Sequence, residues 1–157
     1  QTGASDPNNL SLMYGNGTNA VAPTSSVYTV GNSDETNYAY DYIAYVWHSV
    51  AKYSKIGTYV GNGNTTGPTV NTGFEPAWIL FKRTDATNGW SIIDSARSTS
   101  NPRTSVLQPM NSDPEYTSNS YAVDFLSNGF QIKNSDNGWN TSGGTYLYMA
   151  FAVPLTT

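Results

Sequence analysis

Cysteine is absent from the 157 residues, and charged side chains make up only 11% of them. Without thiols, no disulfide can hold the fold together and no thiolate metal site can form. The 7 Lys and Arg residues are scattered, and the formal net charge is −4. Because nucleic-acid binding needs clustered Lys and Arg, this balance excludes a nucleic-acid partner.

Long hydrophobic runs are also missing, since no apolar stretch reaches the roughly 18 residues of a membrane-spanning helix. We therefore expect no membrane insertion. The single histidine, His48, follows Trp47, and no GxSxG motif accompanies it. The glycine turns at 15–17 and 61–63 match neither the dinucleotide nor the P-loop pattern. A packed or surface histidine is a simpler interpretation than a catalytic base, and we predict no enzyme and no cofactor.

Aromatic side chains are abundant, at 13% of the chain with 12 Tyr, and polar loop residues fill much of the rest. Short alternating segments bounded by Gly, Asn and Pro are typical of strands. The segments 55–60, 77–82 and 89–94 have this pattern, and the Asn-Gly pair at 128–129 predicts a tight hairpin. We predict an all-β, antiparallel jelly-roll-like β-sandwich, with a core that contains Trp78, Phe81, Trp90, Phe125, Phe130 and Phe151.

An internal repeat organises the chain. Residues 25–34 (SSVYTVGNSD) align with 127–136 (SNGFQIKNSD), and 41–47 (DYIAYVW) align with TYLYMAFA at 145–152. Residues 1–53 are therefore predicted to be the C-terminal half of a preceding repeat, packed into the same sandwich, and 54–157 a complete repeat. Alternation predicts strands at 10–14, 27–30 and 40–47, and the last two are predicted to pair as a hairpin. Residues 43–51 fit a helical period as well, and the repeat favours the strand.

Several polar residues are candidates for binding or chemistry. Asp34 and Asp136 lie in Asn-Ser-Asp loops that suit calcium, but Asx turns explain the same residues. Two carboxylate pairs, Asp113 with Glu115 and Asp94 with Asp124, are conceivable in a glycoside hydrolase. Asp94 is explained more simply by an ion pair with Arg97, three residues later.

Glycan binding is the more attractive alternative for the loops. Tyr and Trp rings stack on sugars, and Asn and Asp side chains bond their hydroxyl groups. Trp139 and Tyr116, with Asn137 and Asp113, are the predicted glycan-binding residues. Contacts with other subunits are the competing interpretation for the same loop aromatics.

The stretches SKIGTYVGNGNTTGPTVNTGFEPAWILFKRTD, GWSIIDSARSTSN, DFLSNGFQIK and SGGTYLYMAFA resemble a repeat of virion structural, tail-fibre-like proteins of marine and cyanobacterial tailed phages. That resemblance implies a concanavalin-like or SPRY-like sandwich in an extracellular virion appendage. It also implies other virion proteins and further copies of the chain as partners, with host-surface glycan adhesion as the task. A purely structural capsid-decoration or fibre-assembly subunit, and a polysaccharide-degrading hydrolase, are the alternatives.

Overall fold

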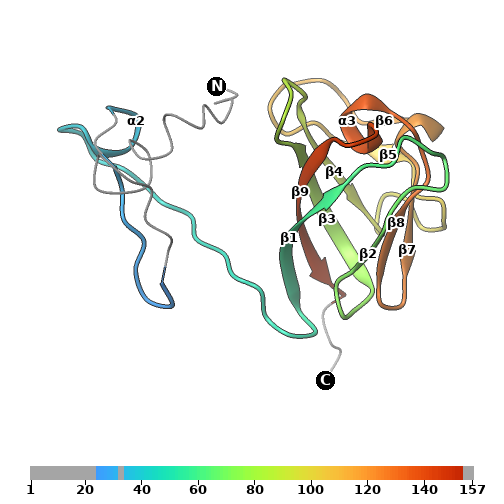
Figure 1. Ribbon diagram of the computed structural model, residues 1–157, viewed down its shortest axis with the longest axis horizontal. Coiled ribbons are helices and arrows are strands. Elements are labelled where there is room, and N and C mark those ends of the chain that lie inside the picture. The colour runs from blue at the N-terminus through green and yellow to red at the C-terminus, as the bar shows by residue number, and fades with distance from the viewer. Residues whose placement is uncertain (1–23, 32–33, 154–157) are drawn as a thin grey trace. The chain divides into compact units, whose positions relative to one another are not determined.

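The computed structural model describes residues 24–31 and 34–153 (Figure 1). The chain divides into two compact units between Val46 and Trp47. The second unit contains all of the strands in the described residues. They are β1 (Ser54–Val60), β2 (Thr69–Asn71), β3 (Pro76–Arg83), β4 (Trp90–Asp94), β5 (Ser105–Val106), β6 (Tyr116–Thr117), β7 (Val123–Leu126), β8 (Gly129–Ile132) and β9 (Thr145–Ala152).

These strands form two main antiparallel sheets. One has the order β1-β9-β3-β4 and the other the order β2-β8-β7, while β5 and β6 pair separately. Two short helices interrupt the loops, a 3-10 turn at Asn119–Tyr121 and α3 at Asn137–Asn140. Figure 1 shows the two sheets as facing layers, with β9 running through the middle of the larger one.

The predicted hairpin at the Asn-Gly pair is confirmed as β7–β8, in which Leu126 lies opposite Gly129. Gly129 also pairs with Asn71 of β2. A Cβ atom at this position would lie 1.9 Å from the carbonyl oxygen of Val70. Glycine is therefore required here, because only its backbone approaches β2 closely enough to continue the sheet.

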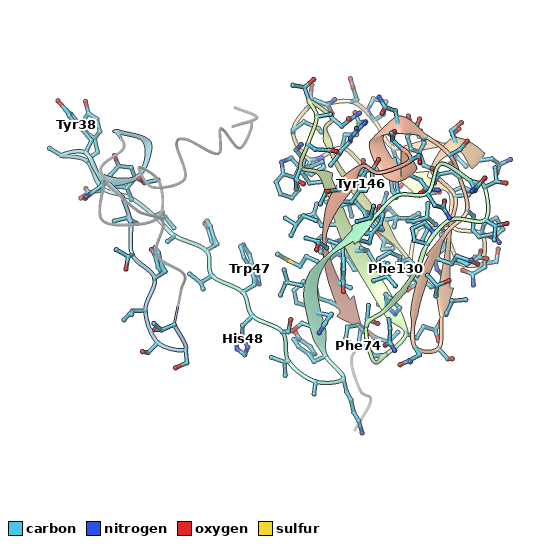
Figure 2. All side chains as sticks on the ribbon, in the orientation of Figure 1. Tyr38, Trp47, His48, Phe74, Phe130 and Tyr146 are labelled. Carbon is cyan, nitrogen blue, oxygen red and sulfur yellow. The ribbon has the colours of Figure 1, made fainter. Side chains whose placement is uncertain are left out.

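Aromatic rings fill the space between the two sheets. The Phe130 ring of β8 lies 5.5 Å from the Phe81 ring of β3 and 5.2 Å from the Tyr148 ring of β9, both edge-on. Figure 2 shows Phe130 and Tyr146 inside the sandwich, and neither exposes any surface. This packing confirms the predicted all-β antiparallel sandwich.

The predicted core was half right. Phe81, Phe125 and Phe130 are buried as expected. Trp78, Trp90 and Phe151 are only half-buried, because they lie on the opposite face of the four-stranded sheet. Alternation shows which residues of a strand share a face, but it does not show which face packs against the second sheet.

The first unit was predicted to contain a hairpin, and that prediction is wrong for its described residues. The structure has a short helix α2 at Asp34–Asn37, and it assigns no strand within 24–31 or 34–46. A β-pattern becomes a strand only where a neighbouring backbone completes its hydrogen bonds. The predicted strand at 10–14 lies outside the described residues, and the assignment of 1–53 to a preceding repeat stays a prediction.

Candidate functional site

Trp139, the leading candidate for glycan stacking, is a core residue. It lies in α3 and is only 2% exposed. Its ring centroid is 4.6 Å from that of Phe81 and 5.6 Å from that of Tyr121. No sugar can stack on a ring enclosed in this way, so the prediction for Trp139 is corrected. The sequence around Trp139 is typical of a polar loop, but it forms the helical turn α3, which points the Trp139 ring into the core.

Tyr116 packs against Tyr121, which in turn contacts Trp139. Its ring meets Tyr121 edge-on at 5.3 Å, and its hydroxyl accepts a hydrogen bond from Gln108 at 3.1 Å. Partial burial, and then the neighbouring Tyr121, raise the pKa of Tyr116 to about 12. The hydroxyl therefore stays protonated at physiological pH, and the half-buried ring offers little free surface.

Asn137 anchors the beginning of α3. Its backbone carbonyl accepts a hydrogen bond from the Tyr146 hydroxyl at 2.9 Å, and its side-chain oxygen accepts one from the Thr141 hydroxyl at 2.6 Å. The guanidinium of Arg83 also donates to both oxygens of Asn137. Asp113, by contrast, lies in an exposed loop, where it accepts a hydrogen bond from Asn111 and is not part of these contacts.

Asp136 forms the Asx turn that the sequence left as the alternative to calcium binding. Its side chain caps α3 by accepting a hydrogen bond from the Gly138 amide at 2.7 Å. The side chain of Asp34 lies outside the described residues. Within the described part of the chain, no three His, Cys, Asp or Glu residues are grouped as a metal site would need.

Three of the four acidic residues considered for hydrolysis, Asp94, Glu115 and Asp124, are paired with cations. Asp94 and Glu115 both contact Arg97, at 2.6 Å and 2.9 Å, which confirms the predicted Asp94–Arg97 ion pair. Burial raises the pKa of Asp94, but hydrogen bonds from Arg97 and from the Ala96 amide outweigh burial and hold that pKa below its usual value. Its carboxylate is thus ionised at neutral pH, as a partner in a structural ion pair.

A buried amide that the sequence analysis did not single out connects the loops at this end of the sandwich. Asn140 is completely buried. Its side-chain oxygen accepts a hydrogen bond from the Asn62 amide at 2.8 Å. Its side-chain nitrogen donates to the carbonyl oxygens of Asn64 and Asn134, each at 2.7 Å. Nothing in the sequence distinguishes Asn140 from the many other Asn residues in polar loops.

A polar hollow lies beside this amide. Its volume is about 350 Å³, and its lining combines amide, hydroxyl and charged groups without an aromatic ring. Such groups can bond the hydroxyls of a sugar, but the stacking surface that would normally orient the sugar is missing. The lining residues are Thr65, Asn119, Ser120, Lys133, Asn134, Ser135 and Asp136.

The outer face of the four-stranded sheet carries a second, apolar hollow of about 270 Å³. We call this surface the outer groove. In register, Leu80 of β3 lies between Met149 of β9 and Ile92 of β4. Trp47 lines one part of the groove from the segment before β1, and it is 54% exposed. The outer groove is lined by Trp47, Ile56, Trp78, Leu80, Trp90, Leu147, Met149 and Phe151.

The fold and these surfaces define an antiparallel β-sandwich module with one apolar sheet face. The chain belongs to the family described as Domain of unknown function (DUF7483), whose model matches residues 6–154. No curated protein and no solved structure matches this chain. Among the described helices, none is long and apolar enough to cross a membrane.

Proposed function

We propose that this chain is a non-enzymatic structural module of an extracellular virion appendage, which assembles with other virion proteins and with copies of itself. The outer groove carries this proposal. Contiguous apolar surface on a soluble domain commonly marks an interface with another protein. The resemblance of the β1–β4 and β7–β9 stretches to tail-fibre-like repeats supports the virion setting.

The occupant that best fits the outer groove is the same face of a second copy. Lys82 lies beside Trp90 at one end of this face, and Asp94 lies beside Trp78 at the other. A two-fold axis that lies in the interface, perpendicular to the strands, places one copy over the other with its strand ends reversed. Each Lys82 then approaches the Asp94 end of its partner, while the apolar centres meet.

Sedimentation velocity of face variants tests this assembly. Leu80→Glu places a carboxylate at the centre of the outer groove, and burying it unpaired in an interface is costly. We expect the wild-type chain to dimerise and Leu80→Glu to sediment as a monomer with an unchanged circular dichroism spectrum. The control is Leu126→Glu at the β7 end, where the side chain is 36% exposed away from the groove.

The control variant should dimerise like the wild-type chain. A wild-type chain that stays monomeric, or a Leu80→Glu variant that dimerises as strongly, would contradict the proposal.

Glycan adhesion is a second candidate function, and the polar hollow is the observation that favours it. Lys133 and Asp136 lie among the hydroxyls and amides of its lining, as in many sites that bind sugar hydroxyls. A multivalent display of the chain on a glycan array should show binding that Lys133→Ala weakens. Absence of any binding at high valency would leave assembly as the function.

A further inference from the structure

Residues 31–42 repeat a hydrogen-bonded arrangement that surrounds α3. In both places a four-residue helix ends at an asparagine. The side-chain nitrogen of Asn37 donates to the carbonyl oxygen of Gly31 at 3.0 Å. The side-chain nitrogen of Asn140 donates in the same way to Asn134 at 2.7 Å, and each bond spans six residues.

A second hydrogen bond, from a backbone amide to the hydroxyl of a tyrosine after the helix, also occurs in both places. The Tyr38 amide donates to the Tyr42 hydroxyl at 2.9 Å, and the Thr141 amide donates to the Tyr146 hydroxyl at 2.8 Å. The sequence repeat aligns Tyr42 with Tyr146, but it aligns Gly31 with Lys133 rather than Asn134. Apart from Asp34, the two helices lie between the aligned segments. The bonds are an observation separate from that alignment, because similar letters do not require the same side-chain geometry.

The sequence repeat aligns the segment after α2 with β9, whose side chains alternate between the two faces of its sheet. In β9, Tyr146, Tyr148 and Ala150 are buried in the core, and the residues between them are half-buried on the outer face. The aligned inward positions of the first unit are Tyr42, Ala44 and Val46. The aligned outward positions are Ile43, Tyr45 and Trp47.

The surroundings of the two segments differ. β9 pairs along its whole length with β1 on one edge and β3 on the other. Residues 41–48 belong to no strand in the described part of the chain, and Val46 is 71% exposed where the aligned Ala150 is completely buried. An apolar segment with this alternation buries its side chains when strands flank both of its edges.

We propose that residues 31–48 form a second element of the α3–β9 type, whose strand, residues 41–48, docks between the β1-type and β3-type strands of another sandwich of the same kind. Docking supplies backbone partners on both edges, as β-strand addition does in other proteins. It also places Tyr42, Ala44 and Val46 in the core of that sandwich. This inference does not depend on the outer groove being an interface.

A graft into the full chain tests whether the segment fits such a slot. The in-register graft replaces residues 145–152, TYLYMAFA, with residues 41–48, DYIAYVWH. We expect it to keep the circular dichroism of a sandwich and to unfold cooperatively. Its melting temperature should fall by about 10–20 °C, because Tyr148→Ala leaves a cavity and Ala150→Val crowds its site.

The control is a graft shifted by one residue, which inserts residues 42–49, YIAYVWHS, at the same place. It introduces Ala150→Trp at a completely buried position and Tyr146→Ile, which removes the repeated hydrogen bond. We expect this graft to show no cooperative unfolding. A third graft, DYIYYVWH, is also in register but keeps Tyr148. It has the same residue at position 148 as the shifted graft, so a difference in stability between these two grafts comes from other positions.

The proposal stands if either in-register graft unfolds cooperatively at a higher temperature than the shifted graft. It is overturned if the shifted graft is as stable as both of them, or if neither in-register graft folds.

Discussion

Replacing Trp139 with alanine is expected to lower the free energy of unfolding by about 4 kcal/mol, because a large buried ring leaves a cavity that the neighbouring rings cannot fill. Trp139 is 2% exposed and packs between Phe81 and Tyr121. It therefore connects α3 to β3 and to the loop before β7. Urea unfolding followed by circular dichroism measures the loss.

Trp90→Ala is the matched control, since the same ring type lies half-buried on the outer face of β4. At protein concentrations at which the chain is monomeric, we expect a loss of about 1 kcal/mol there, in proportion to the smaller apolar area removed from contact. Equal losses in the two variants would mean that Trp139 is not a core residue. A glycan-binding role for Trp139 would instead predict little change in stability and a loss of binding.

Replacing Asn140 with alanine is expected to cost about 3 kcal/mol, because it leaves the Asn62 amide and the carbonyl oxygens of Asn64 and Asn134 without their buried partner. Asn140→Asp should be at least as harmful at neutral pH. Its carboxylate would face two carbonyl oxygens in a site without exposure to water.

The comparison residue is Asn119, which is exposed on the 3-10 turn. Asn119→Ala should leave the free energy of unfolding within about 0.5 kcal/mol of the wild-type value. Thermal unfolding of Asn140→Ala, Asn140→Asp and Asn119→Ala measures the loss of stability in each variant. A harmless Asn140→Ala would show that the loop at 61–67 is held by something other than this amide.

Most of the longer strands of the second unit could be predicted because turn residues with a specific role bound them. The Asn-Gly pair fixes the β7–β8 hairpin, and the alternation of β3 and β4 places their residues on two faces. β2 was missed because it has only three residues, Thr69–Asn71, and its place in the sheet depends on the close approach to Gly129. Such contacts between distant segments leave no local pattern.

The candidate site was harder to predict than the fold. Sequence analysis placed Trp139 in a loop, yet the cap at Asp136 begins a helical turn that turns this ring inward. It placed Trp78 and Phe151 in the core, although they line the outer groove. Both errors have one cause: composition identifies large apolar side chains, but only packing decides which of them remain accessible.

Hydroxyl-radical footprinting of the unmodified chain over a dilution series tests the outer-groove assembly most directly. Met149 lines the groove, and Met110 is 41% exposed in a loop that does not contribute to it, so one protein contains both the probe and its reference. We predict that the oxidation rate of Met149, relative to Met110, falls as the protein concentration rises and the dimer forms. A ratio that stays constant across the series, including concentrations at which the chain sediments as a dimer, would contradict the account.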